Sequence, residues 1–157
     1  MFTWTHSETV TTPASASQIW ARWADAANWP EWDREVEWVR LNGPFSKGTT
    51  GKMKPSGGPE VAFELTEVTP NVSFTDTARL PLTEMVFTHE YLPQEDGEQA
   101  RIRHSVTLTG LLAPLFGKVI GTKIKAHLAE AMEKLSCRAM AETDSISETT
   151  RRRRVKV

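Results

Sequence analysis

Cysteine and long apolar runs are scarce in this chain of 157 residues, and each shortage excludes a class of protein. The single cysteine, Cys137, cannot form an internal disulfide and is typical of a reducing compartment. No apolar run approaches the roughly 20 residues that a membrane-spanning helix needs. The first residues, MFTWTHSETV, lack the basic and apolar segments of a secretory signal. We therefore expect a cytoplasmic protein without a transmembrane segment.

Net charge is also small, at −1, but the charges are distributed unevenly. The segment RRRRVKV carries five of the 19 basic residues, so residues 1–150 hold 14 basic against 20 acidic ones, a net charge of −6. An acidic body disfavours a nucleic-acid groove, and we expect no specific nucleic-acid partner. Two interpretations of the basic segment stay open: a solvated end, or an electrostatic contact with RNA, DNA or an anionic membrane.

Compact catalytic and metal-binding motifs are missing as well. The segment KPSGGP, residues 54–59, is a flexible turn that lacks the helix, lysine and hydroxyl of a phosphate-binding loop. Two strand histidines, His89 and His104, would need a third ligand such as Asp76 to hold a metal, and no recognisable spacing supports one. No nucleophile or orienting carboxylate accompanies them. We expect no metal and no cofactor.

What the chain does contain is a clear succession of elements. Residues 2–12 are rich in threonine, valine and aromatics and predict a first strand. Ser15 with Gln18 three residues later has the spacing of a capping box, so a short helix should begin there. A second helical turn is expected over residues 26–33.

The remaining chain predicts a sheet followed by one long helix. Between residues 35 and 109, period-two segments separated by turn signals predict six consecutive antiparallel strands. An apolar stripe from Pro114 to about residue 141 predicts a helix long enough to cross such a sheet. Residues 142–157 carry few apolar groups and are expected to form a disordered polar and basic tail.

Two longer segments carry a family resemblance. SASQIWARWADAANWPEWDREVEWV at 15–39 and QARIRHSVTLTGLLAPLFGKVIG at 99–121 are similar to the START/Bet v 1-like (SRPBCC) superfamily, and within it to the polyketide cyclase/dehydrase-like group. The resemblance covers about residues 3–141 and implies one domain over 1–141. Its implied fold class is α+β, a helix-grip: a curved seven-stranded antiparallel sheet around the long C-terminal helix, with two short helices between strands 1 and 2. Shorter matches are KGTTGKMKP at 47–55 and ELTEVTP at 64–70.

The tryptophans gather near the start of the chain, where five of the six fall between positions 20 and 38. Indole rings bury large areas, so Trp20, Trp23 and Trp29 are predicted to pack in the core and anchor the two short helices. Trp32 follows Pro30, where the chain turns towards the second strand. We expect Trp32 to look into the ligand cavity that the resemblance implies between sheet and helix.

Alternation along two strands orients the histidines. His89 shares a face with Phe87, and His104 shares one with Val106, so both imidazoles should point inward and lie near each other across a hairpin. Two interpretations stay open: acid–base or hydrogen-bonding groups in the cavity, or satisfied core histidines. The predicted cavity residues are Trp32, Met53, Phe63, Phe74, Phe87, His89, His104, Phe116, Ile120 and Ile124, with His89 and His104 as the candidate catalytic groups.

Two smaller features lead to further expectations. Gly117 and Gly121 lie one turn apart inside the long helix, at a cost of about 1 kcal/mol each relative to alanine. They predict close packing against the short helices, or room for a ligand. Asp76 and Arg79 lie in a segment with too weak an alternation to orient them, so an exposed pair is expected.

These observations favour a protein that binds a small or medium hydrophobic molecule, such as a lipid, an aromatic or a polyketide-like compound. One alternative is a cofactor-independent polyketide cyclase, dehydratase or aromatase in which a cavity histidine moves a proton. The other is a non-catalytic interaction scaffold. The superfamily resemblance does not choose among these, because one fold hosts many functions. The sequence also leaves open whether the protein is a monomer or a homodimer.

Overall fold

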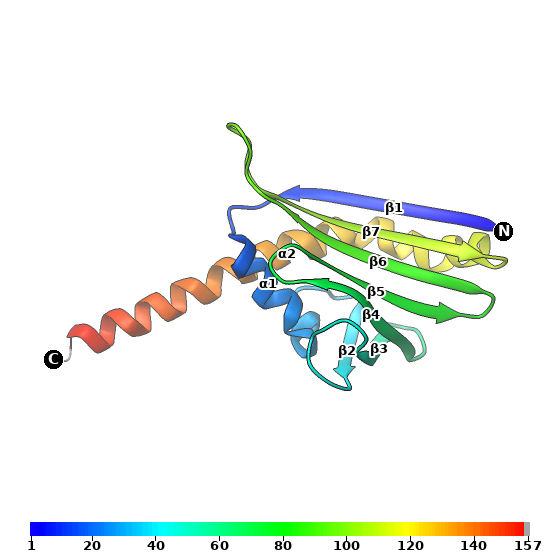
Figure 1. The fold of residues 1–157 in the computed structure, drawn as a ribbon, viewed down its shortest axis with the longest axis horizontal. Coiled ribbons are helices and arrows are strands. Elements are labelled where there is room, and N and C mark those ends of the chain that lie inside the picture. The colour runs from blue at the N-terminus through cyan, green and yellow to red at the C-terminus, as the bar shows by residue number, and fades with distance from the viewer. Residues whose placement is uncertain (156–157) are drawn as a thin grey trace.

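The structure is a computed structural model that describes the backbone of residues 1–155 and the side chains of residues 1–141. One sheet and one long helix dominate it, with two short helices after the first strand (Figure 1). This arrangement confirms the predicted helix-grip fold. The elements are β1 (Phe2–Thr11), α1 (Ala16–Ala24), the 3-10 helix η1 (Ala26–Glu31), β2 (Val36–Leu41), β3 (Thr50–Pro55), β4 (Val61–Thr69), β5 (Ser73–Leu80), β6 (Thr83–Leu92), β7 (Arg101–Gly110) and α2 (Ala113–Val155).

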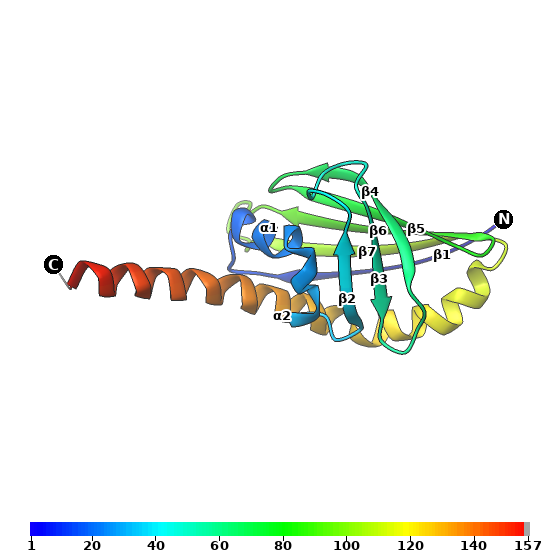
Figure 2. The same ribbon diagram turned by 90° about the horizontal axis from the view of Figure 1, so that it is seen from below.

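All seven strands belong to one antiparallel sheet in the order β1-β7-β6-β5-β4-β3-β2. Strands β2 to β7 form a meander, and β1 joins the free edge of β7. The register shifts between Val36 and Trp38 and between Leu65 and Glu67, and an extra residue of this kind bends a strand. Figure 2 shows the resulting curved sheet with α1 and α2 on one side of it.

The start of α1 follows from its capping residues. The Ser15 hydroxyl accepts a hydrogen bond from the backbone N–H of Gln18 at 3.3 Å, and the Gln18 side-chain oxygen accepts one from the backbone N–H of Ser15 at 2.8 Å. This reciprocal pair confirms the predicted capping box. The helix ends at Ala24, and the chain continues directly into η1, which contains Pro30.

Helix α2 is longer than the sequence predicts. Its helical backbone continues from Ala113 to Val155, whereas the apolar stripe predicts an end near residue 141 and a disordered tail. For residues 142–155 the predicted disorder is therefore replaced by helix, and residues 156–157 lie outside the described part of the chain. No glycine or proline follows Gly121, so the sequence supplies no helix stop. None of the helices described is both long and apolar enough to cross a membrane.

The two helix glycines are explained by Trp4, the one tryptophan outside the group at residues 20–38. A Cβ atom on Gly117 would lie 2.8 Å from Cδ1 of Trp4, and one on Gly121 would lie 2.5 Å from its Cζ2. The indole of Trp4 therefore lies flat against this part of α2. The expected partner was the pair of short helices, and that expectation was wrong: the glycines let α2 approach β1.

Candidate functional site

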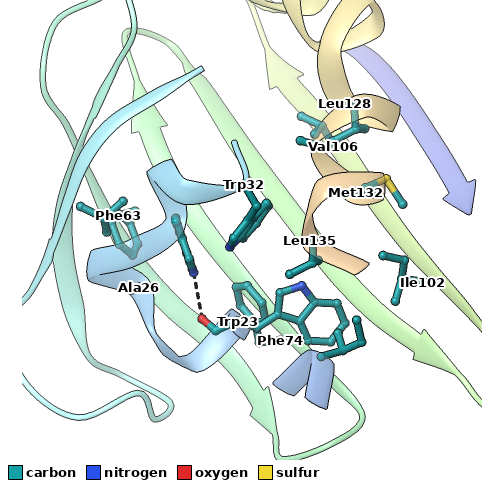
Figure 3. Close-up of a cluster of buried hydrophobic side chains, with 14 of the residues drawn as sticks. Trp23, Ala26, Trp32, Phe63, Phe74, Ile102, Val106, Leu128, Met132 and Leu135 are labelled. Atoms are coloured by element: carbon teal, nitrogen blue, oxygen red, sulfur yellow. Dashed lines mark hydrogen bonds between the residues drawn. The ribbon is translucent and has the colours of Figure 1, made fainter. Parts of the chain in front are cut away.

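An aromatic cluster fills the space beside α1 and η1. Trp23 and Phe74 are fully buried, with ring centroids 5.6 Å apart. The indole N–H of Trp29 donates to the backbone carbonyl of Trp23 at 2.9 Å (Figure 3). Trp20 is half-buried and packs edge-on against Trp23. The three tryptophans of α1 and η1 all contact Phe74 on β5. This position agrees with the prediction that they anchor the short helices to the sheet.

His89 and His104 lie inside this cluster, directly opposite each other on β6 and β7. Their ring centroids are 4.5 Å apart, and both side chains are buried. The His89 ring is stacked between Phe74, at 3.9 Å, and Phe87, at 4.4 Å. The sequence predicted this inward, adjacent placement from strand alternation, and the register of the hairpin agrees with it.

Burial governs the protonation of the two histidines. It lowers the pKa of His104 from 6.5 to about 3, because an imidazolium ion loses its hydration among aromatic rings. Burial also lowers the pKa of His89, and the neighbouring His104 lowers it further, against a small opposing effect of the Phe74 carbonyl. Both rings are therefore neutral at pH 7. Such weak bases are poorly suited to take up a proton from a ligand.

Several buried nitrogen atoms in the cluster have no hydrogen-bond partner among the described residues. They are Nε2 of His104 and Nε1 of Trp23 and of Trp32. Trp32 is buried, and its ring centroid lies 6.2 Å from that of His104 and 6.3 Å from that of Trp29. An unpaired buried N–H costs about 1–3 kcal/mol. The cluster therefore retains unused hydrogen-bonding capacity next to its histidines.

Asp76 is the site residue that the sequence did not identify. On the core-facing side of β5 it lies between Phe74 and Ala78, both buried. Its cross-strand neighbours are Leu65 on β4 and Phe87 on β6. These apolar surroundings raise the pKa of the Asp76 carboxyl from 3.8 to about 7.

The expected surface pair of Asp76 with Arg79 does not form. Three positions apart on one strand, the two side chains point to opposite faces of the sheet. Arg79 is exposed, whereas Asp76 is half-buried towards the core, and no ion pair joins them in the described structure. Only the neighbouring strands reveal the orientation of Asp76, because its own strand alternates too weakly.

The ten predicted cavity residues divide into two groups. One group is buried in or beside the aromatic cluster and comprises Trp32, Phe63, Phe74, His89 and His104. The other group is only half-buried and comprises Met53, Phe87, Phe116, Ile120 and Ile124. Of this second group, Met53, Phe87, Phe116 and Ile124 pack against the core.

Two hollows in the structure lie away from most of these residues. One of about 520 Å³ is at the surface beside η1 and β2 and is lined by residues 24–27 and 39–41. Another, between Trp32 and the charged side chains of α2, has no free volume. The buried group is packed by ring contacts among its own side chains and those of its neighbours. Among the described residues, no set of three or more His, Cys, Asp or Glu side chains is placed to hold a metal.

A curved seven-stranded antiparallel sheet around a long helix, with its concave side rich in aromatics, defines a helix-grip protein. More specifically, the chain belongs to the polyketide cyclase / dehydrase and lipid transport family, which matches residues 3–140. The match agrees with the START/Bet v 1-like resemblance of the sequence motifs, and solved structures share the fold. No curated protein matches the chain in sequence.

Solved structures share the fold at low sequence identity. The di-domain ARO/CYC StfQ from the steffimycin biosynthetic pathway is 14% identical with a TM-score of 0.71, and the match covers 90% of this chain and 52% of StfQ. Norcoclaurine synthase from Thalictrum flavum, in complex with dopamine and hydroxybenzaldehyde, is 18% identical over 89% of this chain and 88% of the synthase, with a TM-score of 0.67. A START superfamily protein from Mycobacterium smegmatis is 16% identical over 84% and 96%, with a TM-score of 0.65. At these identities the likeness shows the fold alone.

Proposed function

We propose that the protein binds a hydrophobic molecule carrying one polar group, between the sheet and the first half of α2. The observation that supports this most directly is the inward carboxyl of Asp76, which lies opposite the half-buried Phe87 on the core-facing side of the sheet. Other apolar side chains on that side of the sheet and on α2 are half-buried as well. Met53 and Phe87 lie on the sheet, and Phe116 and Ile124 lie on α2. A ligand there would cover apolar surface, which is worth about 25 cal/mol per Å².

Asp76 would orient this ligand. With a pKa of about 7, its carboxyl is present in both protonation states near neutral pH. The protonated form donates a hydrogen bond to a ligand carbonyl, and the ionised form accepts one from a ligand hydroxyl or amine. Pockets of this kind combine an apolar lining with a few placed polar groups. The neutral aromatic cluster would form the rigid closed end of the site.

Binding is tested with the neutral fluorescent probe N-phenyl-1-naphthylamine and by native mass spectrometry of the purified protein. We expect probe binding and a co-purified apolar passenger. Ile124→Glu should weaken probe binding by about tenfold or more, because a charge would be buried without a partner. Ala126→Glu, at an exposed position of the same helix, is the matched control and should bind as the wild type does.

Two results would overturn the proposal. One is a wild-type protein that neither binds the probe nor carries a passenger. The other is an Ile124→Glu variant that remains folded by circular dichroism and binds the probe as tightly as the wild type. Binding at the 520 Å³ surface hollow instead would leave both substitutions without effect, since neither residue lines it.

A second candidate function is an enzyme of the cyclase or dehydratase type, and the raised pKa of Asp76 favours it. A carboxyl that is half-ionised near pH 7 can take a proton from a ligand carbon and return it to a ligand oxygen. In this scheme Asp76 replaces the histidines as the acid–base group. Aromatic polyketide precursors are incubated with the protein and analysed by mass spectrometry. Turnover that Asp76→Asn abolishes while the variant still binds the probe would establish the enzyme.

A further inference from the structure

One end of the molecule exposes an unusual number of apolar side chains. Phe2 begins β1, Leu82 lies in the turn between β5 and β6, and Leu111 lies between β7 and α2; their exposed fractions are 55%, 68% and 60%. The backbone N–H of Leu111 donates to the carbonyl of Leu82 at 2.9 Å, and Phe2 pairs with Gly110. The backbones of the three residues therefore lie close together, at the end of the sheet where the N-terminus lies (Figure 1).

The first turns of α2 extend this surface. Leu115 and Val119 are 54% and 60% exposed and, four residues apart, lie on one face of the helix. The opposite face carries Gly117 and Gly121 against Trp4. This part of α2 is thus apolar on both sides, although only one side packs on the sheet.

The exposed apolar side chains are concentrated rather than scattered. Among the side chains of residues 1–141, six large apolar ones besides Met1 are exposed, and five of them lie at this end of the fold. The sixth, Val72, lies in the turn between β4 and β5, at the opposite end of the strands. Single exposed apolar residues are ordinary on proteins, but a gathered group marks an interaction site. We call Phe2, Leu82, Leu111, Leu115 and Val119 the apolar tip.

Basic residues flank the apolar tip. Lys118, Lys123 and Lys125 are exposed on the same part of α2, and the sequence from 99 to 129 contains no aspartate or glutamate. On the strands beside the tip, Glu84 lies opposite Arg79 in the register of β5 and β6, so these two charges are of opposite sign and neighbour each other. This end of an otherwise acidic body is therefore positive.

From this combination we infer that the apolar tip docks on an anionic lipid bilayer. The leucines and valine enter the interface between headgroups and acyl chains, while the lysine stems reach back to the phosphates. Each lysine near such a surface adds to the electrostatic attraction. A second copy of the chain would bring the same lysines against these, so like charges oppose self-association through the tip. The docking surface is distinct from the proposed ligand site and does not depend on it.

Co-sedimentation with vesicles tests this inference on the full chain. We expect binding to vesicles that contain phosphatidylserine, little binding to phosphatidylcholine alone, and weakening as salt rises. The double variant Leu115→Asp/Val119→Asp should lose most of the binding, and Lys118→Gln/Lys123→Gln should weaken it several-fold. Val72→Asp introduces the same charge at an exposed apolar residue of the opposite end and should bind as the wild type does.

Three outcomes would overturn the inference. The first is a wild-type protein that does not bind phosphatidylserine vesicles. Binding that survives both double variants would place the contact elsewhere, with the basic segment RRRRVKV as its source. A dimer in size-exclusion chromatography that Leu115→Asp/Val119→Asp dissociates, without vesicle binding by the wild type, would identify the tip as an interface between two copies. Circular dichroism confirms that each variant is folded.

Discussion

Dehydration acts on Asp76 and on the two histidines in opposite directions. Loss of water disfavours the charged form of any group, so it raises the pKa of a carboxyl and lowers that of an imidazole. Asp76 and His89 are close, because Phe87 lies opposite Asp76 and two positions before His89 on β6. One patch of the sheet therefore holds a carboxyl that titrates near neutrality beside imidazoles that do not.

Asp76→Asn should remove a pH dependence of stability. Since the folded state raises the carboxyl pKa, its contribution is complete below pH 3.8 and is lost as the pH rises to about 7. Relative to the variant, the wild type should lose on the order of 2 kcal/mol of unfolding free energy between about pH 4 and about pH 8, allowing for screening of the partly exposed side chain. Urea unfolding at both pH values measures this difference. Equal pH dependence in the two proteins would contradict it.

The histidine pair should stay neutral in mildly acidic solution. Nitrogen chemical shifts from long-range 1H–15N NMR spectra should show neutral tautomers of His89 and His104 at about pH 5, where an ordinary imidazole is protonated. Because the folded state lowers these pKa values, the associated stability is present above pH 6.5 and declines as the pH falls below it. Resonances of either ring that titrate with a midpoint near 6.5 would show that the cluster is hydrated.

The sequence predicted that the histidine side chains point to the core-facing side of the sheet, but it did not predict this for Asp76. His104 lies between Ile102 and Val106, so its own strand defines the inward face. Around Asp76 only Phe74 and Ala78 mark that face, and the deciding neighbours come from other strands. Cross-strand contacts of this kind depend on register, which alternation within one strand does not contain.

Among the elements, the contact between β1 and α2 depends on a large side chain meeting two small ones. Trp4 fills the space that Gly117 and Gly121 leave, so the glycines are needed for packing even though they weaken the helix. The sequence showed the glycines and their helical spacing. Their partner lies more than 100 residues away on the first strand, which periodicity within the helix could not indicate.

Gly121→Ala should destabilise the protein despite alanine's higher helix propensity. Its Cβ would stand 2.5 Å from the Trp4 ring, and overpacking of this kind costs about 1–3 kcal/mol. In a Trp4→Leu background the clash is absent, so the same substitution should be neutral or stabilising by up to about 1 kcal/mol. A double-mutant cycle measured by urea unfolding gives the coupling. Additive effects would mean that Trp4 does not contact Gly121.

The order of the elements was more predictable than their lengths. Six of the seven strands follow turn signals in the sequence, and the capping box places the start of α1. The end of α2 was not predicted, because the end was inferred from the last apolar residues and helical backbone can continue beyond them. The register shifts in β2 and β4, which bend the sheet, also leave no simple signal.

At the scale of the whole molecule, the two ends of the sheet differ in how far their side chains are exposed. At the end near Thr83 and Gly110 lies the apolar tip, and at the other end His89 and His104 are sealed among aromatic rings. Asp76 lies between these two ends. A hydrophobic ligand entering from a membrane at the tip would therefore meet the carboxyl before the closed aromatic end.

A chain that ends at residue 141 should fold with unchanged stability. The last contacts of α2 with the rest of the protein in the described side chains involve the carbonyl of Arg138, which accepts from Arg22 at 3.2 Å, the buried Ala139, and Met140. We expect the Tm of the 1–141 chain to lie within a few degrees of the full-length value. Thermal unfolding by circular dichroism measures it. A much lower Tm would show that residues 142–157 stabilise the domain.

The pairing of β1 with β7 has a consequence for how the chain folds. Thr5 donates a hydrogen bond to the carbonyl of Val106, 101 positions later in the sequence. On the ribosome, β1 must therefore wait for most of the chain to be synthesised before its partner exists, and the sheet is completed only by this late, long-range closure. Topologies with such high contact order fold slowly, and the exposed edge of β7 is open to other chains until β1 arrives.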